Sequence, residues 1–230
     1  MENYHISTVL NSYDRHMPPY EHLPQDIKYS LITDDPNIDD PNKIILGKHT
    51  IKNISDQLLP KYVKCLGWKH LPKTTDKILY TDGSIRVKNK NFYDVVFSHL
   101  QTYDMVFIKH PQLKTTVEEV KNAEKHKKYD IVYIRDNYKR LEKDIGTQII
   151  PLICSGVIGY NNSQKVQNFM NDWFLDIVLN NCLLCQLNLP YILQKHNINV
   201  HILDFDIWKN DYIWVELHRH EQPFDERFNL

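Results

Sequence analysis

The residues of this sequence best suited to chemistry are an acid, a glycine and a serine in a row, Asp82-Gly83-Ser84. They follow the largely apolar residues 77–80, which have the composition of a buried strand. In open α/β sheets, ligands bind outside the carboxyl ends of the strands. A carboxylate at such a point can hold a divalent cation, and the small residues after it leave room for a phosphate. The alternative is a simple β-turn, since Asp and Gly both favour turns.

Short β-branched segments alternate with amphipathic segments along the chain. Strands are predicted at residues 6–10, 27–33, 44–51, 78–80, 105–108, 153–160, 200–203 and 213–216. Helices are predicted at residues 55–66, 91–101, 116–127, 129–143, 163–179 and 185–195, with Ser163 as an N-cap and an interruption at Pro190. This alternation favours an α/β sandwich with a mainly parallel central sheet. Since no linker or repeat divides the chain, we expect one domain over residues 1–230.

Composition bounds the environment of the protein. The 230 residues are 42% hydrophobic and 25% charged, which suffices for a full core. A formal net charge of -1 gives no electrostatic case for nucleic acid as a partner. The longest mainly apolar run, residues 149–160, is shorter than the ~20 residues that span a bilayer, and residues 1–16 lack the features of a signal peptide. We therefore expect a soluble, cytoplasmic protein with buried, inert cysteines.

Several short motifs, spread over most of the chain, together resemble one known family. They are residues 11–15, residues 29–35, residues 80–85, Lys109-His110-Pro111 with Glu118-Glu119, residues 155–158 followed by residues 169–173, and residues 186–191. In this order and spacing they resemble GT-A type glycosyltransferase-like domains. That family includes plant proteins tied to pectin, bacterial sugar transferases and nucleotide-sugar transferases of large DNA viruses.

Two positions depart from the family's pattern. Leu184-Cys185 stands where the family usually has Arg-Asp, so an acid that is a candidate for sugar contact or catalysis is missing. The arginine expected soon after His110-Pro111 is also absent. Activity or donor identity can therefore differ from that of the family.

The resemblance implies a GT-A (Rossmann-like) α/β/α sandwich. About the first 110 residues would bind the nucleotide sugar, and residues 111–230 would form the acceptor side. The implied enzyme moves a hexosyl or deoxyhexosyl group from a UDP-linked or similar donor to a glycan or glycoprotein acceptor, in a host cytoplasm if the chain is viral. Mn²⁺ or Mg²⁺ would neutralise the departing diphosphate. Two alternatives remain: a nucleotide- or glycan-binding module with weak or no activity, and a metal-dependent phosphoesterase or nuclease.

Donor-binding residues follow from the same resemblance and from side-chain chemistry. Tyr13 would stack on a uracil, Asp14 and Arg15 would reach ribose and phosphate, and Asp35 would accept a hydrogen bond from base or ribose. The rest of the predicted donor set surrounds the phosphates: Asp82, Gly83, Ser84, Gly156 and Arg219. The alternatives are structural: a turn cap for Asp14, a solvated loop for Asp35, a bulge at Gly156 and a solvated tail around Arg219.

Metal ligands and a catalytic base complete the expectation. The predicted metal ligands are Asp82, Ser84 and His218. The histidine is included because the resemblance implies a late histidine that completes the metal site, as is common in GT-A enzymes. If transfer inverts the anomeric centre, a carboxylate must deprotonate the acceptor hydroxyl. The candidates for that base are Asp172, Asp176 and Glu216. The sequence leaves the stereochemical outcome, the sugar and the oligomeric state open.

Overall fold

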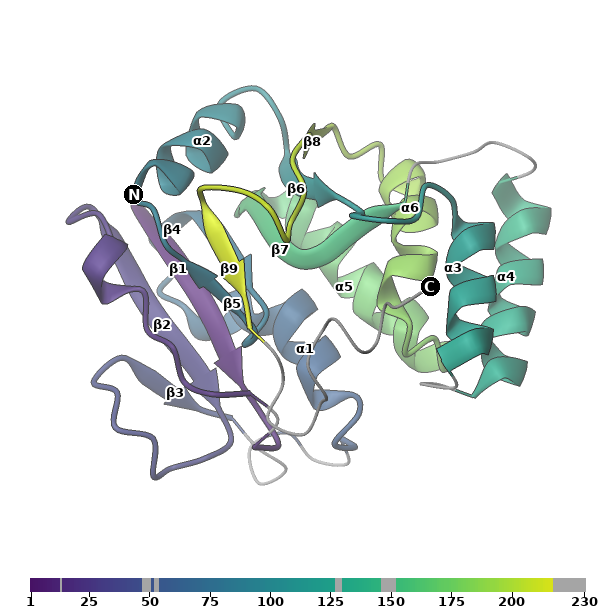
Figure 1. Cartoon of the computed structure of the whole chain (residues 1–230), viewed down its shortest axis with the longest axis horizontal. Helices are drawn as coiled ribbons and strands as arrows, with labels where there is room; N and C mark the ends of the chain where they lie inside the picture. The colour runs from purple at the N-terminus through teal and green to yellow at the C-terminus, as the bar shows by residue number, and fades with distance from the viewer. Residues whose placement is uncertain (13, 47–50, 52–53, 127–129, 146–151, 217–230) are drawn as a thin grey trace.

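The centre of the molecule is a seven-stranded sheet in the order β3-β2-β1-β4-β7-β6-β8 (Figure 1). The computed structural model describes residues 1–12, 14–46, 51, 54–126, 130–145 and 152–216. The strands of this sheet are β1 (Glu2–Val9), β2 (Ile27–Thr33), β3 (Lys43–Ile45), β4 (Thr75–Thr81), β6 (Met105–Lys109), β7 (Ile153–Asn161) and β8 (Val200–Leu203). Strand β7 runs antiparallel to β4 and β6, and the other described pairs in this sheet are parallel. The predicted α/β class with a mainly parallel sheet is confirmed.

Helices lie on both faces of this sheet. They are α1 (Leu59–Leu66), α2 (Asn91–His99), α3 (Thr116–His126), α4 (Ile131–Ile145), α5 (Gln164–Leu179) and α6 (Cys185–Lys195). Short 3-10 turns cover Tyr20–His22 and Gly67–His70. A second, two-stranded sheet pairs β5 (Ile85–Val87) with β9 (Ile213–Val215). No helix in the described part of the chain is long and apolar enough to cross a membrane.

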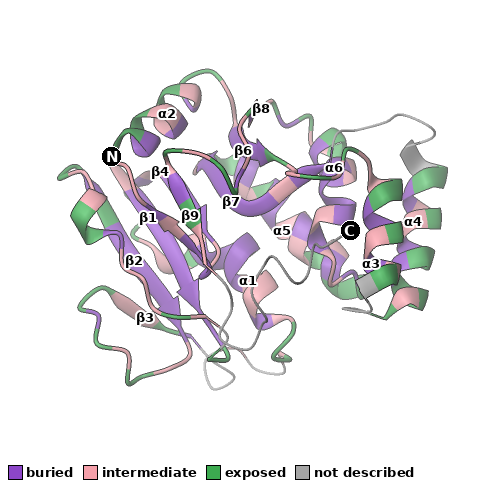
Figure 2. Ribbon diagram, in the orientation of Figure 1, coloured by how far each residue is buried: buried purple, intermediate pink, exposed green. Residues whose placement is uncertain are grey.

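A hydrophobic core lies on each face of the sheet, which explains why its strands are continuously apolar in sequence. In β4, Ile78 and Tyr80 belong to the core beneath α1, α5 and α6, whereas Leu79 belongs to the core with α2, β5 and β9. This is the two-residue alternation of a strand, here with apolar residues on both sides because helices cover both faces. Figure 2 shows the central strands as largely buried.

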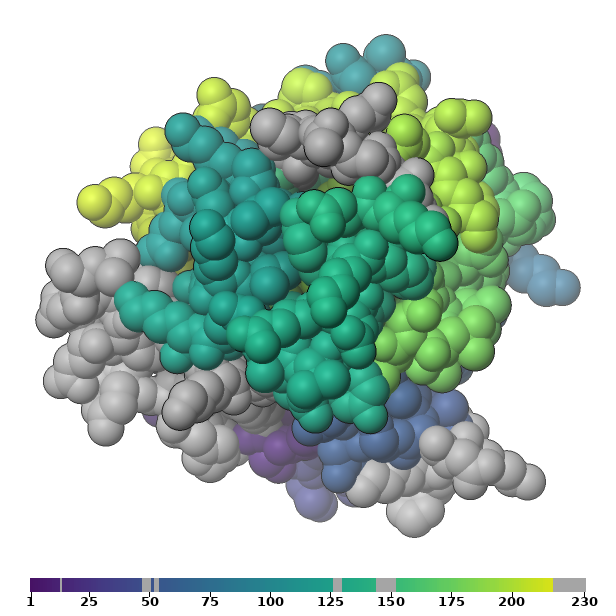
Figure 3. All heavy atoms as spheres, turned by 90° about the vertical axis from the view of Figure 1, so that its right-hand side faces the viewer, coloured from purple at the N-terminus to yellow at the C-terminus, as the bar shows by residue number. Residues whose placement is uncertain are grey.

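Helices α3 and α4 pack beside α6 as a pair with a small core of its own. Val120 and Ala123 of α3 meet Ile134 and Leu141 of α4, together with Cys182 and Leu187. In Figure 3 this pair lies across the middle of the face turned to the viewer. This pair extends the molecule beyond the edge of the central sheet (Figure 1).

Four features differ from the sequence-based expectation. Strand β5 was not predicted, because three residues after a turn carry too short a pattern. Helix α1 begins at Leu59, since the residues before it form a turn in which the N–H groups of Leu58 and Leu59 bond to the carbonyl of Ser55. The third strand is Lys43–Ile45, and most of residues 47–53 lie outside the described residues.

The fourth difference is at Pro190, where the helix was expected to be interrupted. Helix α6 runs through it. A proline inside a helix costs about 3 kcal/mol because it removes one backbone hydrogen bond. Burial of Leu187, Leu189, Ile192 and Leu193 offsets that cost. The N-cap at Ser163, by contrast, is confirmed by its side chain accepting the N–H of Val166.

Candidate functional site

The candidate site begins where β4 ends. Thr81 is buried, and its hydroxyl lies 3.0 Å from Nε2 of His5. The next residue, Asp82, donates its N–H to the carbonyl of Gly156 at 2.8 Å and accepts the N–H of Ile85 at 2.9 Å. Residues 82–85 therefore form a tight turn at the carboxyl rim of the sheet, and the side chain of Asp82 is 36% exposed there.

Two glycines allow this turn to lie against its neighbours. A Cβ atom on Gly83 would lie 2.1 Å from the carbonyl oxygen of Thr8 and 2.5 Å from Oδ2 of Asp14. A Cβ on Gly156 would lie 2.9 Å from the side chain of Ile85 and 3.3 Å from Oδ2 of Asp82. The predicted residues Asp14, Asp82, Gly83 and Gly156 are thus brought together at one rim.

Lys64 joins this group although sequence reasoning did not include it. Lys64 as a whole is only 5% exposed. Its Nζ lies 3.1 Å from each carboxylate oxygen of Asp82 and 3.4 Å from Oγ of Ser155. Burial acts to lower the pKa of Lys64, but the Asp82 carboxylate outweighs it and the pKa is raised. The available signal was a lysine inside the apolar face of α1, between Val63 and Cys65.

Other polar groups complete the surroundings of this ion pair. The hydroxyl of Tyr80 donates to Oδ1 of Asp82 at 2.7 Å. Cys185, which begins α6, lies with its sulfur 3.7 Å from Oγ of Ser155. The position where the resembled family has an acid is therefore next to the Lys64–Asp82 pair, and here it carries a thiol beside Ser155. Burial raises the pKa of Cys185, but the positive charges of Lys61 and Lys64 outweigh it and the pKa is lowered.

The carboxyl-terminal part of the chain reaches the same rim. Strand β9 pairs with β5, and beyond it the N–H of Glu216 donates to the carbonyl of Ser84 at 2.7 Å. The predicted residues His218 and Arg219 lie outside the described residues, as does Tyr13.

The acids after β2 have local partners. The Asp34 carboxylate accepts the N–H of Asn11 at 3.0 and 3.1 Å, and Asn11 has a left-handed φ of 57°. Asp35 accepts the N–H of Asn37 at 2.9 Å in a turn of its own loop. Arg15 is exposed. Donor contacts by Asp35 and Arg15 stay predictions.

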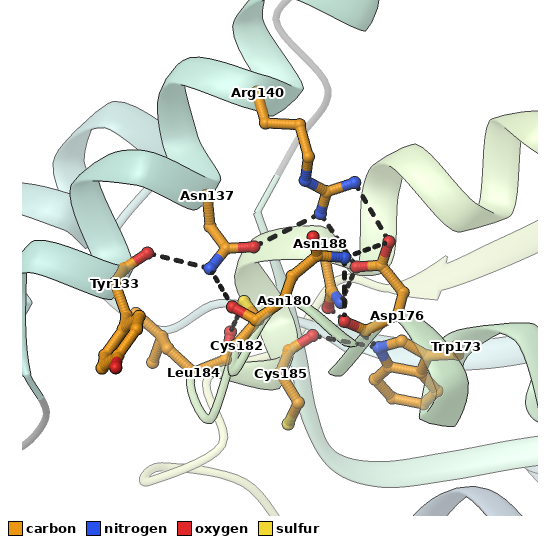
Figure 4. Close-up of polar contacts among 10 residues, drawn as sticks. All are labelled: Tyr133, Asn137, Arg140, Trp173, Asp176, Asn180, Cys182, Leu184, Cys185 and Asn188. Carbon is orange, nitrogen blue, oxygen red and sulfur yellow. Dashed lines mark hydrogen bonds and ion pairs between the residues drawn. The ribbon is translucent and has the colours of Figure 1, made fainter. Parts of the chain in front are cut away.

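Asp176 is part of a polar network that joins three helices (Figure 4). Arg140 of α4 donates to both of its oxygens, at 3.0 and 2.9 Å, and Asn188 of α6 donates at 2.6 Å. The side-chain amide of Asn137 bonds the carbonyls of Tyr133 and Asn180, both at 2.8 Å. Through these contacts Asp176 holds α4, α5 and α6 together, which is a structural role.

Asp172 lies at the other end of α6 from the candidate site. Its carboxylate is 3.0 Å from Nε2 of His196 and 3.2 Å from Nζ of Lys195, at the end of the helix that Cys185 begins. Ten residues of α-helix span about 15 Å. Burial, which raises the pKa of Asp172, is outweighed by hydrogen bonds from His196 and Lys195, and the pKa is lowered. Asp172 therefore pairs with the end of α6 and not with the described rim residues.

The histidine and glutamate of the family-like stretch before α3 also have structural contacts. Nδ1 of His110 accepts the N–H of Leu113 at 2.9 Å, and Glu118 accepts the N–H of Lys114 at 2.6 Å. These bonds organise the loop that starts α3.

A hollow of about 330 Å³ lies at the other end of the sheet. It is lined by Tyr4, Leu23, Ile27, Lys28, Tyr29, Ser30 and Asn42, which lie at or near the amino-terminal parts of β1 and β2. Because Asp82 follows the carboxyl end of β4, which is parallel to β1, this hollow is distinct from the rim site. The rim is favoured as the ligand site because it carries the Asp82 carboxylate and lies at the carboxyl ends of the strands, although the hollow lies elsewhere.

These features define an α/β protein with a mainly parallel sheet and an acidic candidate ligand site at the carboxyl rim. No family model and no curated protein sequence matches the chain. Among solved structures, the fold is similar to the apo form of mouse xyloside xylosyltransferase 1, with a TM-score of 0.46 and 9% identity, over 89% of this chain and 86% of that chain. A similarity at this TM-score carries no argument about activity, which depends on the rim residues themselves.

Proposed function

We propose that this chain binds a nucleotide sugar at the rim formed by Asp82, Gly83 and Ser84 and transfers its sugar to a glycan or glycoprotein acceptor. The observation that carries the proposal is the meeting of β1, β4, β7 and the carboxyl-terminal segment at that turn. Ligands of open α/β sheets bind at such carboxyl ends. Gly83 and Gly156 let the turn lie directly against β1 and β7, which brings these segments together at the rim. The donor is a UDP-linked hexose or deoxyhexose in this proposal.

Transfer places negative charge on the departing diphosphate, and a nearby positive charge stabilises it. The resemblance implies Mn²⁺ or Mg²⁺ held by Asp82, Ser84 and His218; such an ion would act as a Lewis acid on the phosphate oxygens. Among the described residues there is no group of three His, Cys, Asp or Glu that could hold a metal, and Asp82 already contacts Lys64 and Tyr80. The described residues therefore do not complete a divalent-metal site, and the proposal makes no step depend on one.

Glu216 is the candidate base that best fits the proposal. Its backbone contacts Ser84, and a carboxylate there can accept the proton of an acceptor hydroxyl. Asp172 and Asp176 have ion-pair partners on other helices.

A nucleotide- or glycan-binding module without transfer activity is the second candidate. It is favoured by the partners of Asp172 and Asp176 and by Cys185, a thiol beside Ser155 where the resemblance implies a carboxylate. It predicts saturable binding with neither sugar transfer nor slow donor hydrolysis.

Binding and turnover can be tested with one set of variants. Wild-type protein would be screened by thermal shift against UDP and against UDP-, GDP- and TDP-linked sugars, because a ligand of the native state raises its melting temperature. We expect Asp82→Ala to bind the best donor at least tenfold more weakly than wild type, and so to give a smaller thermal shift, because it removes the rim carboxylate that accepts hydrogen bonds and that holds Lys64 in place. Asp204→Ala, the same substitution at an exposed acid paired with Lys109, serves as the matched control.

Donor hydrolysis and transfer by wild type and Glu216→Gln then separate the two candidates. Loss of turnover with retained binding in Glu216→Gln supports transfer. Binding without any turnover in wild type supports the binding module. If no nucleotide or nucleotide sugar stabilises wild type, with or without Mn²⁺, both candidates are wrong.

A further inference from the structure

A buried ammonium group lies where a divalent ion was expected. Lys64 extends from α1 beneath the rim, flanked in sequence by Val63 and Cys65, which are both fully buried. The side chain of Lys64 is 6% exposed, against 36% for Asp82. A charge so well removed from water is costly unless it is paired and hydrogen-bonded. The groups around Lys64 therefore determine how its positive charge is stabilised.

Those partners are one carboxylate and neutral groups. Nζ lies 3.1 Å from both oxygens of Asp82, 3.4 Å from Oγ of Ser155 and 5.8 Å from the ring centre of Tyr80. Cys185 lies beyond Ser155. The single positive charge of Lys64 and the single negative charge of Asp82 cancel within this ion pair. Asp82 therefore has its counter-charge within the protein, and an approaching diphosphate does not meet an uncompensated carboxylate.

A divalent cation would have to compete with this arrangement. An ion bound to Asp82 would sit close to the ammonium, and like charges repel strongly where water is excluded. The same carboxylate also accepts the hydroxyl of Tyr80 at 2.7 Å. Both effects weaken Asp82 as a metal ligand.

We propose that Lys64 is the resident cation of the rim, so that the site binds a nucleoside diphosphate group without a divalent metal. Lys64 acts here as a positioning residue, because it neutralises and orients Asp82 from beneath. The inference rests on the proposed function for its ligand class, but the competition between Lys64 and a metal for Asp82 is independent of any nucleotide. It replaces the metal dependence expected from the family resemblance.

The first experiment measures metal affinity with Mn²⁺ alone, followed by electron paramagnetic resonance. Lys64→Met keeps the length and apolar stem of the side chain and removes the charge. We expect it to bind Mn²⁺ at least tenfold more tightly than wild type, because Asp82 loses its partner. The double variant Lys64→Met with Asp82→Asn should lose that gain. Lys69→Met, the same change at an exposed lysine, is the control and should behave as wild type.

The second experiment measures UDP binding by calorimetry in EDTA and in Mn²⁺. Wild type and Lys64→Arg should bind UDP equally well in both, whereas Lys64→Met should lose at least tenfold in EDTA and regain affinity with Mn²⁺. The UDP affinities of wild type in EDTA and in Mn²⁺ decide whether binding depends on a metal, even if Lys64→Met does not fold. UDP binding by wild type that requires Mn²⁺ would overturn the inference, as would equal Mn²⁺ affinity in a folded Lys64→Met. If wild type binds UDP under neither condition, the proposed function fails, and the Mn²⁺ titration still tests the competition.

Discussion

At the scale of single residues, the buried polar groups beneath the rim distinguish this molecule. Lys64 and His5 are both almost fully buried, and they handle charge in opposite ways. Lys64 keeps its charge because Asp82 lies beside it. Among the described residues, the partners of His5 are neutral: the hydroxyls of Tyr93 at 2.9 Å and Thr81 at 3.0 Å, with the ring of Tyr29 beside it. Burial alone therefore lowers the pKa of His5 to about 3.

The low pKa of His5 predicts a loss of stability in acid. Its ordinary pKa is 6.5, so between pH 6.5 and about 3 the unfolded chain binds a proton that the folded protein excludes. Stability from this residue is complete above pH 6.5 and falls as pH decreases, by up to about 1.4 kcal/mol per pH unit. Urea unfolding of wild type and His5→Gln at pH 7, 6 and 5 measures this.

The difference between the two proteins isolates His5, because other buried groups titrate in both. His110 is one of these, since burial lowers its pKa to about 4. We expect wild type to lose about 2 kcal/mol more than His5→Gln between pH 7 and pH 5. Parallel pH profiles for the two proteins would contradict a neutral, buried His5.

At the scale of elements, α5 carries two of the predicted catalytic acids, and each has a different structural partner. Asp176 joins α5 to α4 and α6, and its side chain is 12% exposed. Asp172 joins α5 to the end of α6 and is 38% exposed. Spacing of four residues placed both acids on one side of the helix, but the packing of α4 and α6 determined what each one contacts.

This difference predicts unequal effects of the same substitution. Asp176→Asn leaves the partly buried Arg140 without a counter-charge, and we expect it to destabilise the protein by about 1–3 kcal/mol. Asp172→Asn removes a more exposed pair and should cost about 0.5 kcal/mol or less. Urea midpoints measure both. A large loss of turnover in Asp176→Asn with unchanged stability would instead indicate a catalytic role.

At the scale of the whole molecule, the rim is built from segments far apart in the chain. Residues 80–85 and 154–156 meet through the pairing of β4 with β7, and residue 216 arrives through β9. A ligand at the rim therefore contacts all three segments at once if the proposed site is correct.

Hydrogen exchange followed by mass spectrometry tests this. UDP or a donor sugar should slow exchange in residues 80–87, 153–157 and 213–216 together, because ligand binding suppresses local opening of the segments it bridges. Asp82→Ala, measured at the same ligand concentration, is the control and should show no slowing. Slowing confined to the hollow around Tyr4, Ile27 and Tyr29 would place the ligand at the other end of the sheet.

Much of the fold could be predicted because its signals are local. Strands β2 and β8 have the predicted bounds, since each carries a continuous pattern with clear ends, and α6 begins and ends at the predicted residues. Strand β5 was missed because three residues, Ile85–Val87, become a strand only by pairing with β9, more than a hundred residues later. The run of α6 through Pro190 was missed for a similar reason, since burial of its neighbours outweighs the local cost.

The candidate site could likewise be predicted only in part from the sequence. The sequence by itself determined an acid, two small residues and a turn at the end of a buried strand, because residue type and strand period are properties of neighbouring positions. Only the tertiary structure decided that Lys64 lies under Asp82, that Cys185 borders Ser155, and that Asp172 pairs with His196 away from these. The physical reason is that an ion pair depends on which side chains packing brings within a few ångströms, and no local pattern specifies that distance.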